Sequence, residues 1–203
     1  MGTVRTVQEL AALYDAPMET SLTKEVDHLV AGHRAYVEAS PFVLIATTGP
    51  DGLDCSPRGD APGFVRVADE RTLLLPDRRG NNRLDTLRNI VVDGRIGLLF
   101  LVPGVAVTLR VNGTAELSTD EELRESFAVR GAPPTTVIVV RTTAVYPQCP
   151  KALVRSHLWD PQRHREPSEL PTLGAMMSAA TEGRVDGDAY DRAYPERLRQ
   201  TIY

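Results

Sequence analysis

Short apolar segments separated by turn residues run through most of the chain. They are rich in β-branched and aromatic residues and are bounded by Gly, Pro, Asp and Asn, a pattern typical of β-strands. The strands predicted from this pattern are residues 41–48, 53–58, 63–67, 72–75, 95–102, 105–117 and 136–146. Strands therefore outnumber helices in the expected fold.

Turn sequences indicate how these strands pair. The sequence GPDG at residues 49–52 is a turn by composition, so we expect residues 53–58 to return antiparallel to residues 41–48. Residues 63–67 and 72–75 repeat this arrangement across a short polar turn. Together the two hairpins predict a meander of four strands.

Two later strands differ in their hydrophobic pattern. Residues 95–102 are apolar almost throughout, as expected for a strand that is covered on both faces. Residues 105–117 alternate between apolar and polar side chains, which predicts one row pointing inward and one pointing outward. The predicted inward row is Val107, Leu109 and Val111, and the predicted outward row is Thr108, Arg110 and Asn112.

Helical spacing of apolar residues appears mainly outside the strands. Thr23 resembles the N-cap of a helix that continues to Ala39 with one apolar face. A capping box at residues 118–121 predicts a helix that continues to Arg130. Shorter helices are expected at residues 84–89, 151–159, 173–180 and 188–199.

These elements predict a mainly β protein in three parts. Residues 41–160 should form a six- to seven-stranded antiparallel barrel with helices packed at its ends, because a barrel leaves no long open edge. Residues 1–40 should form a helical extension packed on the barrel. Residues 161–203 should form an extension that wraps the surface or a partner chain.

Composition excludes several classes of partner. The net charge is −4 and 25% of the residues are charged with both signs mixed, so we expect no nucleic-acid or anionic-membrane binding. No apolar run approaches the roughly 20 residues of a membrane helix, and a signal peptide is not recognisable, which predicts a cytoplasmic protein. Cys55 and Cys149 lie far apart without metal-ligand spacing, so we expect free thiols and no metal site.

Arginine and asparagine residues gather after two of the predicted strands. A guanidinium can bind two phosphate oxygens at once, and a helix N-terminus offers unpaired N–H groups. A phosphate pocket is therefore expected from Arg58, Arg78, Arg79, Asn81, Asn82 and Arg83. The alternative is that these arginines face solvent and that Asn82 only caps a helix.

The same stretch resembles the FMN-binding split-barrel superfamily that includes pyridoxamine 5'-phosphate oxidase. In that superfamily an Arg on one strand and a Ser-Arg-Lys-like turn after a later strand hold the flavin phosphate. Residues 56–60 (SPRGD) and 79–83 (RGNNR) stand at those places, and the resemblance spans roughly residues 35–159. It implies a split barrel, bound FMN, and a flavin ring along the backbone of Ser56, Gly59 and Asp60. Asn81 and Asn82 depart from the pattern by replacing a basic pair.

A second motif, CPKALVRSHLWDP at residues 149–161, is similar to a segment in one branch of these flavoproteins. There the segment of one protomer reaches the flavin bound mostly by the other, which implies a homodimer with composite sites. The residues this resemblance assigns to the cofactor are Lys151, Arg155, Ser156 and Trp159, together with Thr108 at the flavin ring edge. The alternative is an ordinary helix with Trp159 as a packing anchor.

The resemblance implies an FMN-dependent oxidoreductase of an unknown small molecule. The chain lacks the Arg-x-His pattern of vitamin B6 oxidases near its end, which argues against that substrate. No acid/base pair stands out, so the catalytic residues are not predicted. Two alternatives stay open: a split barrel that carries flavin or haem without turnover, and a reductase that uses the deazaflavin F420.

Overall fold

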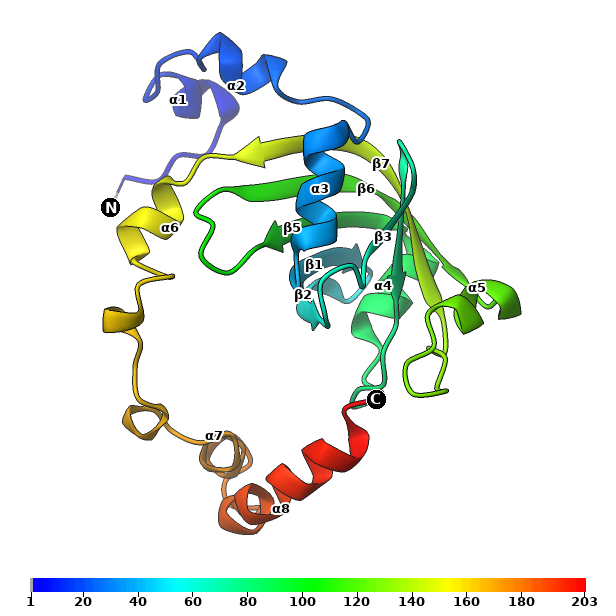
Figure 1. Ribbon diagram of the computed structural model, residues 1–203. Coiled ribbons are helices and arrows are strands. Elements are labelled where there is room, and N and C mark those ends of the chain that lie inside the picture. The colour runs from blue at the N-terminus through cyan, green and yellow to red at the C-terminus, as the bar shows by residue number, and fades with distance from the viewer. Residues whose placement is uncertain (1) are drawn as a thin grey trace.

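The computed structural model describes residues 2–203, and its centre is a single antiparallel sheet of seven strands (Figure 1). The strands are β1 (Phe42–Gly49), β2 (Gly52–Gly59), β3 (Arg66–Asp69), β4 (Thr72–Pro76), β5 (Arg95–Leu101), β6 (Thr108–Ser118) and β7 (Val137–Gln148). Their order across the sheet is β2-β1-β5-β6-β7-β4-β3. The mainly β fold predicted from the sequence is confirmed.

The two N-terminal hairpins form as expected, but they do not join into one meander. β1 pairs with β2, and β3 pairs with β4. The inner strand of each hairpin then pairs with a later strand, β1 with β5 and β4 with β7. β2 and β3 therefore lie at opposite edges of a sheet that is not closed by hydrogen bonds. The predicted four-stranded meander and the absence of an open edge are both wrong.

Two helices cover the inner face of the sheet. α3 (Ala31–Ala39) packs against β3, β6 and β7, and α4 (Asp85–Val92) packs against β1, β2 and β6. Each buries an apolar side chain in the shared core, Val37 from α3 and Ile90 from α4. Burial of one such side chain contributes about 1.5–3 kcal/mol to stability. This packing fixes the first turn of α4 beside the end of β2.

The pattern of burial along β5 corrects one expectation. Ile96, Leu98 and Phe100 are buried, whereas Leu99 and Leu101 on the other face are only half-buried. The expectation that both faces are covered is wrong for the single chain, because the helices lie against the inner face alone.

β6 follows its predicted alternation except at its first residue. Leu109 and Val111 are buried as expected, but Thr108 is only 3% exposed although it was placed in the outward row. The flanking segments fold over this end of the sheet. Lys24 Nζ donates a hydrogen bond to Pro147 O at 2.8 Å, and Trp159 Nε1 donates one to Val105 O at 3.0 Å.

The segment before α3 is not helical. Val26 forms a bridge with Val145, donating to its carbonyl at 3.1 Å, and Leu29 N donates to Glu70 O at 2.6 Å. These hydrogen bonds to distant segments hold the backbone extended, so the predicted helix start at Thr23 is wrong, whereas α3 ends at the predicted Ala39. A separate short helix, α2 (Glu19–Thr23), ends at that residue.

α5 (Glu121–Ser126) is also shorter than predicted. Its N-cap is Asp120, whose Oδ1 accepts a hydrogen bond from Leu123 N at 2.8 Å, rather than a Ser118 hydroxyl. Phe127, which follows the helix, is only 3% exposed. The chain turns at this buried residue, which prevents the helix from reaching Arg130.

The two ends of the chain extend away from the sheet. α1 (Val7–Ala11) and α2 bury no side chain. Residues 157–203, here called the arm, follow α6 (Lys151–Ser156), arch away from the sheet and return near α4 (Figure 1). The arm contains η1 (Pro161–Arg163), η2 (Pro167–Glu169), α7 (Leu173–Ala180) and α8 (Gly187–Thr201), which confirms both predicted helices. Among residues 2–203, no helix is long and apolar enough to cross a membrane.

Candidate cofactor site

β2 presents three polar side chains on one side, because residues two apart in a strand share a face. They are Asp54, Ser56 and Arg58, and they meet Thr86 in the first turn of α4. Thr86 is 2% exposed and donates its hydroxyl to Asp54 Oδ2 at 2.6 Å. Ser56 Oγ donates to the same carboxylate oxygen at 2.9 Å. We call residues 54–60 and 77–86 the β2–α4 corner.

Arg58 is half-buried in this corner and is held by neutral groups. Its Nη1 donates to Pro57 O at 2.9 Å, and its Nη2 donates to Thr86 Oγ1 at 3.3 Å. Within residues 2–203 it forms no ion pair. Burial raises the pKa of the nearby Asp77 carboxyl, and the charge of Arg58 opposes that rise. Arg58 is therefore positioned in advance and keeps N–H donors for an anion.

Arg78 is engaged differently. Its Nε donates to Asp60 Oδ2 at 3.0 Å and its Nη1 to Phe127 O at 2.7 Å. The side chains of Arg78 and Asp60 are 19% and 6% exposed. Burial alone would raise the pKa of Asp60, but hydrogen bonds from Ala61 N, Tyr203 and Arg78 outweigh it and lower that pKa. Arg78 is thus committed to an ion pair inside the protein.

The loop between β4 and α4 lies at the surface. Its exposed polar residues are Arg79, Asn81, Asn82 and Arg83. Asn81 Oδ1 accepts a hydrogen bond from Arg83 N at 3.0 Å, and the Arg83 guanidinium pairs with Asp85. Asn82 has a φ of 59°, a left-handed conformation that asparagine tolerates. Leu84, rather than Asn82, occupies the N-cap position of α4. Arg79 is the remaining arginine of the loop without an ion pair in the described chain.

Gly59 ends β2 close to the chain that precedes β1. A Cβ at this position would lie 3.2 Å from Pro41 O. The next residue, Asp60, donates its N–H to the same carbonyl at 3.1 Å. Internal packing therefore explains the glycine, and it also brings Asp60 into reach of Arg78.

The second predicted cluster lies elsewhere in the fold. Lys151, Arg155 and Ser156 are exposed on or at the end of α6, and Trp159 is half-buried with its indole N–H on Val105 O. The loop of the corner leaves β4 at Pro76, which pairs with Val137 at the start of β7, whereas α6 follows Gln148 at the opposite end of β7. Thr108 pairs with Gln148 at the end of β7, on the α6 side. One chain therefore does not bring its two clusters together.

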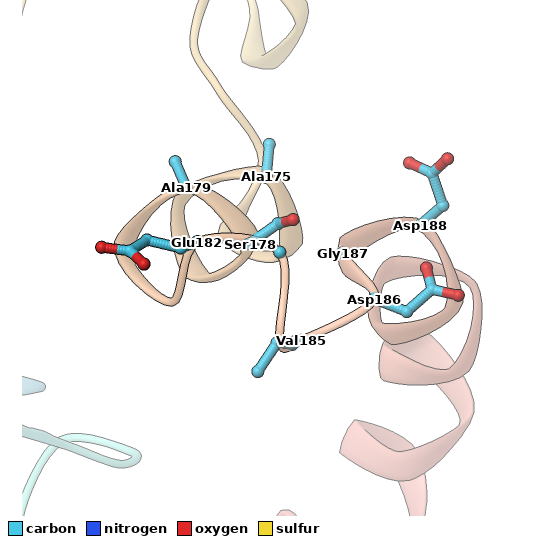
Figure 2. Close-up of a pocket in the computed structure, with 9 residues that line it drawn as sticks. Ala175, Ser178, Ala179, Glu182, Val185, Asp186, Gly187 and Asp188 are labelled. Carbon is cyan, nitrogen blue, oxygen red and sulfur yellow. The ribbon is translucent and has the colours of Figure 1, made fainter.

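A hollow between α7 and α8 is unsuited to a flavin. Figure 2 shows it lined by Ala175, Ser178 and Ala179 on one side and by the acidic Asp186 and Asp188 on the other, with Glu182 near its edge. Its lining offers no cation for a phosphate and no aromatic face for a ring. No group of three or more His, Cys, Asp and Glu within residues 2–203 is placed to hold a metal ion.

A family model described as pyridoxamine 5'-phosphate oxidase matches residues 29–149. The chain belongs to this family. The match includes the β2–α4 corner and ends just before α6 and the arm. No curated protein matches the sequence.

Similar folds occur among solved structures, all at low sequence identity. HupZ of Group A Streptococcus is 19% identical, with 58% of this chain and 92% of that chain covered and a TM-score of 0.48. A putative pyridoxamine 5'-phosphate oxidase of Lactobacillus delbrueckii is 20% identical, with 60% and 95% covered and a TM-score of 0.47. An FMN-binding protein of Syntrophomonas wolfei is 12% identical, with 57% and 83% covered and a TM-score of 0.44.

Three residues of the corner, and one residue that contacts it, were not predicted from the sequence: Asp54, Asp77 and Thr86 of the corner, and Tyr203. The alternation of Asp54 with Ser56 and Arg58 along β2 carries a signal that could have identified the first. Thr86 could have been inferred from its place in the first turn of the expected helix. No local signal connects Tyr203 to the corner, because the contact spans 143 positions of sequence.

Proposed function

We propose that this family member is a flavoprotein that binds FMN at the β2–α4 corner and serves as an oxidoreductase of a small organic molecule. The observation that carries the proposal is the state of Arg58. It is half-buried and oriented by Thr86 and Pro57, and it forms no direct ion pair with a carboxylate of the described chain. An arginine held in this way is suited to binding a phosphate.

The residues present fit an FMN phosphate group. Arg58 and the exposed Arg79 would hold the phosphate, and the backbone from Ser56 to Asp60 would lie along the ring. Arg78 would stabilise the corner through Asp60 instead of binding the phosphate directly. Asn81, Asn82 and Arg83 would contribute through the loop that they shape. When bound, FMN supplies the hydride and electron transfer, and the protein orients it and limits access of water.

The proposal includes a homodimer with two composite cofactor sites. In this proposal each protomer has the three predicted parts: the N-terminal extension of residues 1–40, the barrel of residues 41–160 and the C-terminal extension of residues 161–203. Lys151, Arg155, Ser156 and Trp159 lie away from the corner of their own chain, so they would serve the corner of the partner. Thr108 is buried within its own chain, so the proposal gives its side chain no contact with the partner's flavin. Apolar side chains of the N-terminal helices support a buried interface, since Val7 is 76% exposed and Leu22 is 61% exposed.

The decisive experiment is purification without added cofactor. We expect a yellow protein that releases FMN on denaturation and migrates as a dimer. The variant Arg58→Ala should bind FMN on the order of tenfold or more weakly, because an arginine–phosphate interaction contributes about 1.5–3 kcal/mol. Arg95→Ala is a matched control, since this strand arginine is 71% exposed and, within residues 2–203, forms an ion pair only with the nearby Asp93. Equal affinity of the two variants for FMN would count against Arg58 as a ligand.

A second candidate function is flavin binding without turnover. It is favoured by two carboxylates of the corner, Asp54 and Asp60, because both already accept hydrogen bonds from neighbouring side chains. Addition of NADH or NADPH to the flavin-loaded protein distinguishes the two candidates. Bleaching of the flavin absorbance supports the oxidoreductase, and an unchanged spectrum supports the binding module. Tight binding of F420 in place of FMN would favour a deazaflavin enzyme.

A further inference from the structure

Tyr203, which follows α8, returns to the corner and contacts Asp60. Its hydroxyl donates a hydrogen bond to Asp60 Oδ1 at 2.9 Å. The guanidinium of Arg130 lies over its ring, with 5.3 Å from the guanidinium carbon to the ring centroid. In Figure 1 this end of the chain reaches the loop below α4 after the arm has arched away from the sheet. The arm is therefore attached to the barrel domain at both of its ends.

The contact completes the hydrogen bonding of the Asp60 carboxylate. Oδ1 accepts from Ala61 N at 2.8 Å and from the Tyr203 hydroxyl, and Oδ2 accepts from Arg78 Nε. Arg78 in turn donates to the carbonyl of the buried Phe127. A chain of direct contacts thus connects Tyr203 to Asp60, to Arg78 and to the loop that begins with Arg79.

The outer part of the arm has its own internal packing. α7 and α8 approach so closely that a Cβ on Gly174 would lie 2.2 Å from Gly187 O. Asp191 Oδ1 accepts a hydrogen bond from Gly174 N at 2.8 Å. In contrast, Leu173 and Leu198 of these helices are 42% and 44% exposed. The helix pair therefore forms a unit that is not buried against the sheet, and Tyr203 supplies its polar attachment to the corner.

We propose that Tyr203 is a positioning residue for the cofactor site: it fastens the arm to Asp60 and thereby holds Arg78 and the phosphate loop in place. This inference rests on the proposed function, because the loop that it positions is the one assigned to the FMN phosphate. When the fastening is released, the arm opens, and the phosphate loop loses part of its support. Bound FMN then dissociates faster.

The attachment of the arm through the Tyr203–Asp60 hydrogen bond is tested first, without flavin. Hydrogen exchange is measured on peptides covering residues 195–203 in the apo-protein, in the wild type and in Tyr203→Phe. We expect exchange about tenfold faster in the variant, because it loses one hydrogen bond to a charged group. Tyr194→Phe is the matched control, since the Tyr194 hydroxyl in α8 makes no hydrogen bond within residues 2–203. Equal exchange rates in the wild type and Tyr203→Phe would contradict the proposal that this hydrogen bond attaches the arm.

The positioning role is tested by flavin release. FMN dissociation is followed by recovery of flavin fluorescence after dilution, and we expect a rate several-fold higher in Tyr203→Phe and unchanged in Tyr194→Phe. Faster exchange with an unchanged release rate would overturn the positioning role while leaving the attachment of the arm. Failure of the wild type to bind FMN would overturn the proposed function, a result that the exchange measurement on apo-protein distinguishes. Tyr203→Ala, which also removes the ring from Arg130, should enlarge both effects.

Discussion

The β2–α4 corner and residues 149–161, here called the α6 segment, contain the same kinds of side chain but are organised in different ways. In the corner, the polar groups around β2 are held by residues from other elements, as Thr86 holds Arg58 and Asp54. In the α6 segment the charged side chains are exposed, and Trp159 is fixed by one hydrogen bond to Val105. The comparison shows that contacts within one chain orient the side chains around Arg58, whereas the charged side chains of the α6 segment are left exposed by the same chain.

The largest difference between the two regions should appear in how much the loss of one arginine from each lowers the stability of the protein. Arg78→Ala leaves the Asp60 carboxylate, which is 6% exposed, without its ion pair. We expect the free energy of unfolding to fall by about 3 kcal/mol, since loss of one partner strands a buried charge. Arg155→Ala in the exposed α6 segment should change it by less than about 0.5 kcal/mol. Denaturant titration measures both values.

The double variant Arg78→Ala/Asp60→Asn provides the control for this prediction. It removes the stranded charge, so it should recover part of the lost stability. Equal losses of unfolding free energy in Arg78→Ala and Arg155→Ala would contradict the distinction between a corner whose side chains are held by internal contacts and a segment whose side chains are exposed.

A smaller loss of stability is expected when the Thr86 hydroxyl, which links β2 to α4, is removed. Thr86→Val keeps the shape of the side chain but removes its hydrogen bonds to Asp54 and Arg58. We expect stability to fall by about 1–2 kcal/mol and FMN affinity to fall several-fold. Thr86→Ser retains the hydroxyl and should keep most of the affinity. Calorimetry measures both quantities, and equal FMN affinity in Thr86→Val and the wild type would show that Arg58 needs no support.

The α6 segment offers a spectroscopic test of the composite site. Trp159 is the single tryptophan of the chain, so its emission reports on this segment alone. If a partner's flavin lies beside it, titration with FMN should quench its emission by more than about half, because stacked aromatic systems approach to within about 7 Å. Arg58→Ala should require a higher FMN concentration for the same quenching. Full binding of FMN without any change in emission would place the segment away from the flavin.

The smallest expected effect concerns pH. The pKa of Asp60 is lowered in the folded protein, so its ion pair stabilises the fold above the unfolded pKa of about 3.9. That contribution is lost as the pH falls through the lower, folded value. The difference in unfolding free energy between the wild type and Asp60→Asn should therefore be constant near neutral pH and should narrow below about pH 4. A difference that stays constant to pH 2 would contradict the role of the charged form.

Local sequence patterns were sufficient to predict the secondary structure where that structure is determined by neighbouring residues. All seven strands overlap their predicted segments, because alternation and turn composition act over a few residues. β3 and β6 each begin three residues later than predicted. α7 occupies the predicted residues for the same reason, since Thr172 caps it locally by accepting from Ala175 N. Ser56 and Arg58 could also be selected in advance, because their motif is contiguous and lies on one strand.

Tertiary structure decided everything that depends on contacts between distant residues. Val26 and Leu29 are extended rather than helical because their backbones bond to β7 and to the turn after β3. Arg78 was predicted to bind phosphate, yet it pairs with Asp60, and Tyr203 completes that contact from the far end of the chain. Composition alone cannot assign such partners, because any nearby carboxylate satisfies a guanidinium. The fold determines which carboxylate is near, and it leaves Arg58 available to bind an anion.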